Sequence, residues 1–320
     1  MVVKRRILMG GMINMESQLI SISDLRKVSG IGNKTIERIK EQLEQDEFDK
    51  QYVSKYNKDI HLDVNKIHLG DCLELMNGIP DKSVDMILCD LPYGTTACKW
   101  DIIIPFEPLW EQYERIIKDN GVIALTSTQP FTSNLIVSNL KLFKYQWYWI
   151  KSPTGFLNAK KMPMKSVEDI CIFYKKLPTY NPQGLVLLNK EKSNHKSKMQ
   201  KTEVGISTHN GGRLPEKYMQ KYTNYPKQEL HFPNEKGLHP TQKPVALFEY
   251  LIKTYTNEGE TVLDNCIGSG TTAIAAINTN RNYIGIEMDE GYYKIADDRI
   301  NKHLARTNDS ATNIQSRKTP

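Results

Sequence analysis

The sequence predicts an α/β fold built on a doubly wound parallel sheet, with smaller segments added to it. From about residue 60 onward, short apolar runs without alternation suit strands that are buried on both faces. These runs alternate with segments whose apolar residues recur at helical spacing, which is the pattern of parallel sheets wound with helices. The chain has 320 residues, 39% of them hydrophobic and 25% charged, so it can bury a large core in about two domains.

The predicted core spans residues 57–304. Its first strand and the start of its first helix lie within residues 67–79. Further strands are predicted at residues 84–90, 121–128, 144–151, 168–176, 261–267 and 283–288. Further helices are predicted at residues 105–121, 129–142, 244–256, 271–280 and 290–304. Gly121 is expected to stop the helix over 105–121, and the polar residues 305–320 are expected to form a disordered tail.

Residues 1–56 differ in pattern and are predicted to form a small helical extension. Within them, two short amphipathic segments flank a tight turn that contains Gly30 and Gly32, with Lys34 two residues later. This arrangement resembles a helix-hairpin-helix, in which glycines let the backbone approach a phosphate at a helix N-terminus. The three residues are therefore candidate DNA contacts, and an ordinary helical hairpin is the equal alternative.

Positive charge is concentrated in one central segment. Residues 151–236 contain 16 Lys and Arg against seven Asp and Glu, a net charge of +9, whereas the whole chain carries +6. Such a segment suits a surface that faces a polyanion, and a lysine-rich solvated insert explains the charge equally well. Lys160, Lys161 and Lys165 lie on a predicted loop at its start and are candidate polyanion contacts.

Several classes of protein are excluded by what the sequence lacks. No run of about 18 apolar residues could form a transmembrane helix. The N-terminus lacks the pattern of a secretory signal, so we expect a cytoplasmic protein. Its five cysteines form no Cys-x-x-Cys pair, which argues against a zinc site or a disulfide framework and fits a reducing compartment. We expect no metal.

A glycine-rich turn between a strand and a helix predicts a nucleoside-binding crevice. The strand ends at Asp264, the turn holds Gly268, Ser269 and Gly270, and the helix begins at Thr271. The next strand ends at a carboxylate, Glu287, which is placed to accept hydrogen bonds from ribose hydroxyls. This pattern alone does not separate a nicotinamide cofactor from S-adenosylmethionine.

A second cluster follows the apolar strand over 84–90. Asp90, Leu91, Pro92 and Tyr93 offer a carboxylate, a backbone carbonyl held extended by the proline, and an aromatic face. Such groups suit a planar base with an exocyclic amine, because the acceptors bind its N–H groups while the ring stacks on tyrosine. A nicotinamide oxidoreductase has no evident use for them. An ordinary turn at the end of a strand is the simpler alternative.

Together these motifs resemble those of amino-group DNA methyltransferases over residues 57–304. Residues 90–93 resemble the Asp/Asn-Pro-Pro-Tyr catalytic motif, and residues 264–272 the Asp-Pro-Phe-x-Gly-Ser-Gly-Thr-Thr cofactor loop. Residues 239–244 match the His-Pro-Thr-Gln-Lys-Pro element, and residues 70–72 a Gly-Asp-Cys motif. The catalytic motif precedes the cofactor loop, as in the β group of these enzymes. The resemblance thus implies a Rossmann-like methyltransferase sheet, with residues 151–236 as a target-recognition insert.

The resemblance also implies S-adenosylmethionine as cofactor and assigns residues to it. The candidate cofactor-binding residues are Asp71, Cys72, His239, Lys243, Asp264, Cys266, Gly268, Ser269, Gly270, Thr271 and Glu287. Among them, His239 and Lys243 are expected near the cofactor carboxylate. Two positions depart from the family pattern, namely Leu91 in place of a proline and Cys266 in place of an aromatic residue.

The implied activity is site-specific methylation of double-stranded DNA at the N6 amine of adenine, since Asp at position 90 is the usual adenine marker of the family. Cytosine N4 methylation is the alternative target chemistry. A DNA-binding protein with an inactive methyltransferase core is the alternative of another class. The sequence leaves open the recognition site, a partner restriction endonuclease, and whether the protein is a monomer or a homodimer.

Overall fold

The computed structural model describes residues 60–95, 101–154, 156, 159–193, 217–235 and 242–316. The predicted DNA contacts Gly30, Gly32 and Lys34 and the predicted cofactor contact His239 lie outside the described residues. Contacts along the chain divide it after Lys58, two residues beyond the boundary expected from the sequence. All described residues belong to the second unit.

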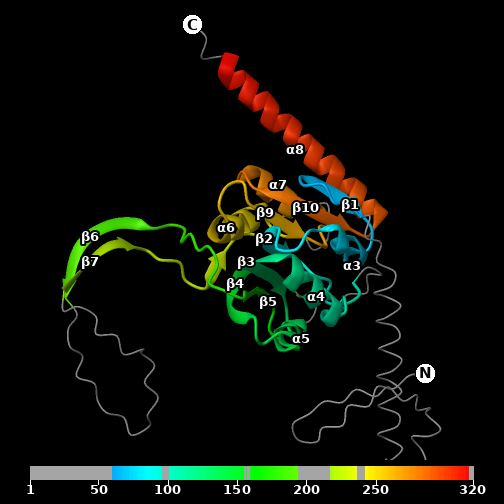
Figure 1. Ribbon diagram of the computed structural model, residues 1–320. Coiled ribbons are helices and arrows are strands. Elements are labelled where there is room, and N and C mark those ends of the chain that lie inside the picture. Colours follow the sequence, from blue (N-terminus) through cyan, green and yellow to red (C-terminus); the bar gives the residue numbers. More distant parts are fainter. Residues whose placement is uncertain are drawn as a thin grey trace, which may run out of the picture. The chain divides into compact units, whose positions relative to one another are not determined.

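An eight-stranded sheet forms the centre of the described unit (Figure 1). Its strands in spatial order are β1 (Lys66–Leu69), β10 (Asn282–Glu287), β9 (Thr261–Asp264), β2 (Val84–Cys89), β3 (Ile117–Ser127), β5 (Lys165–Phe173), β4 (Phe143–Thr154) and β8 (Glu229–His231). Strands β1 to β3 are parallel to one another, and β5 runs antiparallel to both β3 and β4. From β9 the chain continues to β10 on one side, and from β2 it continues to β3 on the other side. In sheets of this kind, such a switch point places a ligand crevice beyond the carboxyl ends of the two strands.

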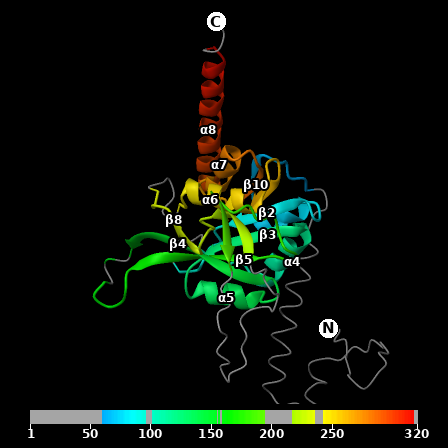
Figure 2. The same ribbon diagram turned by 90° about the vertical axis from the view of Figure 1, so that its left-hand side faces the viewer.

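Helices cover both faces of this sheet (Figures 1 and 2). One face carries α6 (Val245–Tyr255), α7 (Thr271–Asn278) and α8 (Glu290–Ser316), and the other carries α3 (Cys72–Leu75), the 3-10 helix η1 (Met76–Gly78), α4 (Phe106–Ile116) and α5 (Phe131–Ser138). Strand β2 is buried on both sides. Met86 and Leu88 pack with Leu251 of α6 in one core cluster. The alternate residues Ile87 and Cys89, which point to the other face of the sheet, are also fully buried. The doubly wound α/β prediction is confirmed.

Gly121 does not end a helix, as the sequence suggested. Helix α4 ends at Ile116 and the chain enters β3 directly, so Gly121 lies inside a strand. A Cβ atom there would lie 2.7 Å from Cγ1 of Ile117 and 2.9 Å from the carbonyl oxygen of Asp85. Close packing within the sheet, rather than a helix stop, therefore explains this glycine.

The basic segment 151–236 is not one separate insert. Strand β5 lies within it and is an inner strand of the central sheet, buried over its second half, and the end of β4 also belongs to that sheet. Beyond β5, β6 (Val186–Ser193) and β7 (Lys217–Thr223) pair with each other in a two-stranded ribbon. The sequence showed no strand period here because both faces of the ribbon are largely exposed and neither needs to be apolar.

The surface and the C-terminal segment complete the described unit. Helix α8 continues to Ser316, so most of the predicted tail is helical, and no glycine or proline interrupts residues 305–316.

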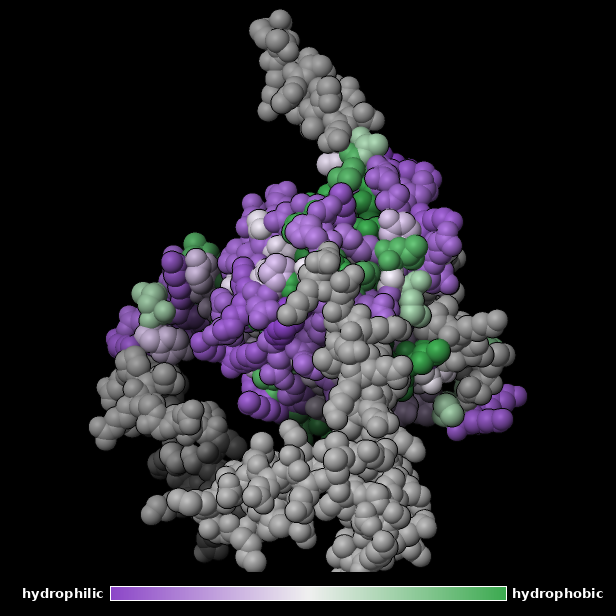
Figure 3. All heavy atoms as spheres, turned by 45° about the vertical axis from the view of Figure 1, so that its right-hand side comes forward, coloured by the Kyte–Doolittle hydropathy of each residue, from purple (hydrophilic) through white to green (hydrophobic). Residues whose placement is uncertain are grey.

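The face in Figure 3 is mainly hydrophilic, with hydrophobic side chains in small separate groups. Within the described ranges, no helix is long and apolar enough to cross a membrane. The same residues contain no cluster of His, Cys, Asp or Glu that could hold a metal ion.

Candidate active site

Asp90 is the first residue after β2, at the carboxyl edge of the sheet. The chain turns sharply just beyond it, because Gly94 has a φ of +66° and a side chain there would press on Ile103. The buried carboxylate of Asp101 fixes this turn by accepting hydrogen bonds from the backbone N–H groups of Gly94 and Thr95, at 2.8 and 2.9 Å. Asp101 was not among the residues predicted from the sequence.

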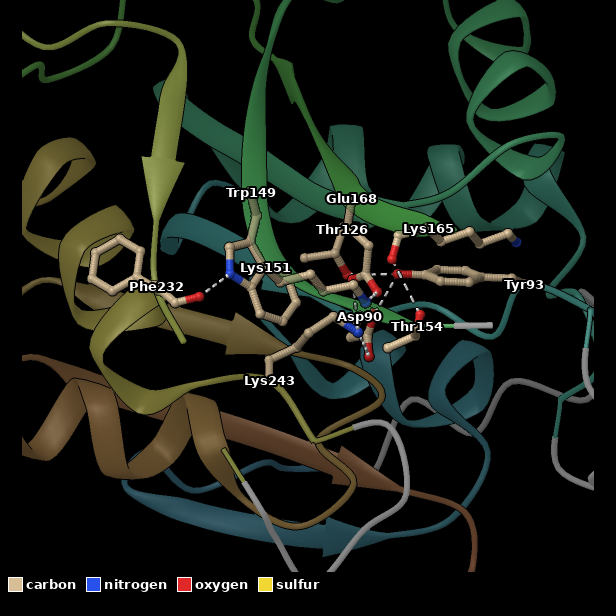
Figure 4. A network of polar contacts seen from close by, with 10 residues as sticks. All are labelled: Asp90, Tyr93, Thr126, Trp149, Lys151, Thr154, Lys165, Glu168, Phe232 and Lys243. Carbon is tan, nitrogen blue, oxygen red and sulfur yellow. Dashed lines mark hydrogen bonds and ion pairs between the residues drawn. The ribbon is translucent and has the colours of Figure 1, made fainter. Parts of the chain in front are cut away.

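Three side chains donate hydrogen bonds to the Asp90 carboxylate (Figure 4). The Tyr93 hydroxyl donates to Oδ1 over 2.6 Å, and the hydroxyl of Thr126, at the end of β3, donates to the same oxygen. The Lys243 ammonium, just before α6, donates to Oδ2 over 2.6 Å. The structure thus places Lys243 against the Asp90 carboxylate, whereas the resemblance suggested a contact with the cofactor.

Lys243 also belongs to a chain of alternating charges that the sequence analysis did not find. Its ammonium lies 3.6 Å from Oε2 of Glu168 on β5, and Oε1 of Glu168 pairs with Lys151 on β4. The side chains of Lys243, Glu168 and Lys151 are only 5%, 14% and 13% exposed. Charged residues at the ends of two predicted strands, Lys151 and Glu168, were the available signal, since buried charges in proteins are paired.

Tyr93 presents a ring beside this network. The ring packs on Phe131 with centroids 5.2 Å apart and an interplanar angle of 31°, and the Lys243 ammonium lies 5.7 Å from its centroid. Burial and the nearby Asp90 charge raise the pKa of the Tyr93 hydroxyl well above its usual value. Tyr93 therefore stays protonated and acts as a hydrogen-bond donor. Leu91 is buried beside it, and Pro92 restrains its backbone.

Asp264 provides a second carboxylate at the same edge, at the end of the neighbouring strand β9. Its Oδ1 accepts a hydrogen bond from the Cys266 backbone N–H over 3.0 Å, and its Oδ2 accepts one from the Thr272 hydroxyl. Burial raises the pKa of Asp264 to about 6, against a usual value of 3.8. These contacts make Asp264 the internal brace of the glycine-rich turn.

Glu287 closes the other side of that turn. Its Oε2 accepts a hydrogen bond from the Gly268 N–H over 2.8 Å, and its Oε1 accepts one from the Asp289 N–H over 2.9 Å. Each oxygen keeps a further lone pair for a ribose hydroxyl. Gly268 and Gly270 have φ values of +53° and +83°, and a Cβ atom at Gly268 would meet only the Cys266 carbonyl, 4.0 Å away. This open glycine cradle with a carboxylate at its rim fits a nucleoside cofactor.

The rest of the cofactor loop is tied to α8. Arg299 donates hydrogen bonds to the Ser269 carbonyl over 2.9 Å and to the Thr271 hydroxyl over 3.2 Å. The Ser269 hydroxyl donates to Oε1 of Gln242 over 3.2 Å, so the loop also meets the segment that carries Lys243. The structure therefore brings most of the predicted cofactor-binding residues to one edge, beside Asp90.

Asp71 and the cysteines have structural partners. Asp71 caps α3, because its Oδ1 accepts hydrogen bonds from the N–H groups of Leu73 and Glu74. Cys72 is buried and Cys266 is half-buried. Burial raises the pKa of the Cys89 thiol to about 12, which keeps it protonated and unsuited to act as a nucleophile.

The three lysines predicted to contact DNA lie where β4 and β5 turn back on each other. Lys160 and Lys161 are exposed in the connection, and Lys165 is exposed at the first position of β5, opposite Thr154. The pairing of Ser127 with Asp169 shows that residues 165–168 extend beyond the end of β3. The lysines therefore lie beyond the carboxyl edge that carries Asp90.

Comparisons with known proteins agree with this geometry. The family model described as DNA methylase matches residues 84–298. The type II methyltransferase M1.MboII of Moraxella bovis is 28% identical over 261 residues, covering 75% of this chain and 98% of that protein. The DNA adenine methyltransferase YhdJ of Escherichia coli K12 is 28% identical over 263 residues, covering 78% and 87%. The solved structure of the cytosine-N4-specific PvuII DNA methyltransferase shares the fold, with a TM-score of 0.52 and 16% identity over 77% of this chain and 93% of that one.

Proposed function

The chain belongs to the DNA methylase family, and we propose that it methylates the N6 amine of adenine within a specific sequence of double-stranded DNA. It is a DNA methyltransferase that uses S-adenosylmethionine. The observation that carries the proposal is the position of Asp90, one strand away from the braced cofactor loop of Asp264. Asp as the first residue of the catalytic motif favours adenine, and the relative YhdJ is called an adenine methyltransferase.

The chain's own groups account for recognition of the amine. A stacked and paired adenine cannot reach the crevice, so the base must leave the helix, and the Tyr93 ring offers a stacking surface. Asp90 and the Leu91 carbonyl accept the two amine hydrogens and orient the nitrogen lone pair. Glu287 and the Gly268 turn hold the cofactor, which supplies a methyl group on a sulfonium. Catalysis then depends mainly on positioning and on stabilising the developing charge.

Sequencing that detects modified bases, applied to DNA from cells expressing the protein, tests this function directly. The expected result is N6-methyladenine within one short recognition sequence, absent from cells that express Asp90→Ala. N4-methylcytosine would replace the adenine assignment with the alternative target. A complete absence of methylation by a folded protein that does not bind S-adenosylmethionine would favour a DNA-binding protein with an inactive core.

We propose that the basic segment recognises the DNA target, and the β6–β7 ribbon offers a suitable face. The register places Lys190 opposite Gln220 and Lys192 opposite Tyr218, so these four side chains share one side. On the other side Glu191 pairs with Lys217 over 2.9 Å. The first side combines cations for phosphates with an amide for base edges and carries no acid, and a two-stranded ribbon fits the DNA major groove.

Salt dependence of DNA binding tests the role of the lysines beside the active site. Replacing Lys160, Lys161 and Lys165 together by Ala should weaken binding and reduce the slope of log affinity against log salt by about 2–3. A matched control replaces three exposed lysines elsewhere, namely Lys66, Lys294 and Lys302, and should leave the slope unchanged. Equal slopes for the two triple variants would show that Lys160, Lys161 and Lys165 do not contact DNA.

The proposal also includes the setting of the reaction. We place the enzyme in the cytoplasm, and the free cysteines Cys72, Cys89, Cys171 and Cys266 suit a reducing compartment. A restriction endonuclease with the same recognition sequence is the proposed partner. Its test is whether the methylated sequence is resistant to an endonuclease activity of the source cells. Sedimentation of the purified protein, alone and with DNA, distinguishes a monomer from a homodimer.

A further inference from the structure

Lys243 lies between two carboxylates that hold it unequally (Figure 4). Its ammonium hydrogen-bonds Oδ2 of Asp90 over 2.6 Å but lies 3.6 Å from Oε2 of Glu168, which is too far for a hydrogen bond. That oxygen of Glu168 is buried and accepts no hydrogen bond from any described residue. A buried carboxylate oxygen in this state is costly, so a hydrogen-bond donor that reached it would be strongly stabilised.

The acceptor sites of Asp90, in contrast, are nearly full. A carboxylate offers about four lone-pair sites, and three are taken by Tyr93, Thr126 and Lys243. In the proposed function the target amine must donate to this same carboxylate. Both hydroxyls are on Oδ1, so the one acceptor site left for the amine is on Oδ2, the oxygen that the Lys243 ammonium already holds.

We propose that Glu168 is a positioning residue that draws the Lys243 ammonium away from Asp90 when the target amine arrives. This inference depends on the proposed function, because it concerns the same amine. A movement of about 1 Å brings the ammonium within hydrogen-bond distance of Glu168 Oε2. The amine then takes the place of Lys243 on Asp90, and the buried Glu168 oxygen gains its missing hydrogen bond. Lys151 keeps Glu168 in place through the other oxygen.

The exchange has a chemical consequence at Asp90. A carboxylate oxygen released from a cation has a free lone pair for another donor, so Asp90 is the better acceptor for the amine once Lys243 leaves. In the reaction the N–CH₃ bond forms while the S–CH₃ bond of the sulfonium breaks, and the amine nitrogen must then lose a proton. Asp90 takes that proton and becomes neutral. The movement of Lys243 therefore strengthens the acceptor at the step that needs it.

Several ionisable groups lie around Asp90. Cys89 and Tyr93 belong to the same segment, Asp264 lies on β9, and Glu168 and Lys243 come from β5 and the start of α6. Among these described groups, Lys243 is the only cation in hydrogen-bond contact with Asp90. Its movement therefore removes the cation that holds Asp90 Oδ2.

Single-turnover methylation by the full chain tests the proposal. With Glu168→Gln, Lys243 stays on Asp90, so the rate at the pH plateau should fall by about tenfold. Lys151→Met is the matched control, because it breaks the other half of the same buried ion pair. It leaves the Glu168 carboxylate to attract Lys243, so its plateau rate should stay within about twofold of the wild-type rate. A purely structural role predicts the same loss for both variants.

A double-mutant comparison separates action through Lys243 from direct action of the Glu168 charge. In a Lys243→Met background, Glu168→Gln should change the plateau rate by less than about twofold. The same tenfold loss in both backgrounds would overturn the proposal, and so would an unchanged plateau rate in the single variant Glu168→Gln. Glu168→Asp, which keeps the charge but withdraws the oxygen, replaces Glu168→Gln if the latter is unfolded by thermal melting.

A structure of the enzyme with target DNA and S-adenosylhomocysteine gives a measurement besides activity. The Lys243 ammonium should then lie about 2.9 Å from Glu168 Oε2 and outside hydrogen-bond range of Asp90. An ammonium that stays on Asp90 while the amine is bound would refute the exchange. A failure of the proposed function looks different, because the wild-type enzyme itself would then leave the DNA unmethylated.

Discussion

Asp90 and Asp264 end neighbouring strands at one edge of the sheet, yet the two carboxylates are held in different ways. The hydrogen-bond donors to Asp264 are two and eight residues away along the chain. The donors to Asp90 are three, 36 and 153 residues away and come from separate segments. The contacts of Asp264 therefore form within one local loop, whereas those of Asp90 form only when distant parts of the chain have folded together.

The two carboxylates also differ in access. Asp264 is 2% exposed, and burial raises its pKa to about 6. The Asp90 side chain is 23% exposed, so it can still be reached from outside. The difference is in keeping with the proposed roles, in which Asp264 shapes the cofactor loop and Asp90 contacts the reacting amine.

The largest expected effect comes from removing the accessible carboxylate. Asp90→Ala should lower the single-turnover rate by about 10³-fold, since the acceptor and proton-binding group of the amine is lost. Isothermal titration should show S-adenosylmethionine affinity within about threefold of wild type, because the cofactor loop is braced without Asp90. A variant that methylates DNA at nearly the wild-type rate would contradict the assigned role.

Asp264 should instead make the free energy of unfolding depend on pH. The folded carboxyl group releases its proton near pH 6, whereas the unfolded one does so near 3.8, so its contribution to stability is complete below pH 3.8 and is lost as the pH rises through 6. The loss corresponds to about 3 kcal/mol. We expect the free energy of unfolding, measured with urea, to differ between pH 4 and pH 7, and this difference should be about 2 kcal/mol smaller in Asp264→Asn than in the wild type. An unchanged difference would show that Asp264 ionises normally.

Two variants of Tyr93 distinguish the role of its ring from the role of its hydroxyl beside Asp90. Tyr93→Phe should reduce the rate only a few-fold, because Thr126 and Lys243 still donate to Asp90 and the ring still packs on Phe131. Tyr93→Ala removes the stacking surface as well and should cost about 10–100-fold, equivalent to ~1–3 kcal/mol. Equal rates for the two variants would show that the ring does not hold the base.

The same contrast explains how much the sequence predicted. The turn from Asp264 to Thr272 and its partner Glu287 follow one strand–turn–helix–strand unit, so local spacing was enough to predict a cofactor loop. Asp90 and Tyr93 were also predicted, because they are close in sequence. The alternating strands and helices were equally visible, and the parallel core is confirmed.

Groups that meet only through tertiary packing were missed. No spacing rule connects Glu168 on β5 to Lys243 just before α6, and the two meet only in the folded chain. The resemblance assigned Lys243 to the cofactor, and only the folded chain shows its hydrogen bond to Asp90. Gly121 was misinterpreted for a related reason, since its constraint is the Asp85 carbonyl on a neighbouring strand.

The smallest expected effects come from a matched pair of hydroxyls. Thr126 donates to Asp90 and Thr272 donates to Asp264, so Thr126→Val and Thr272→Val each remove one hydrogen bond with little change of shape. Each should cost a few-fold, because the other donors remain. Thr126→Val should slow single-turnover methylation and leave S-adenosylmethionine affinity intact, whereas Thr272→Val should weaken that affinity and leave the rate at saturating cofactor intact. If both variants changed the same quantity, the two carboxylates would form one functional unit, because loss of a donor on either side would then disturb both binding and the chemical step.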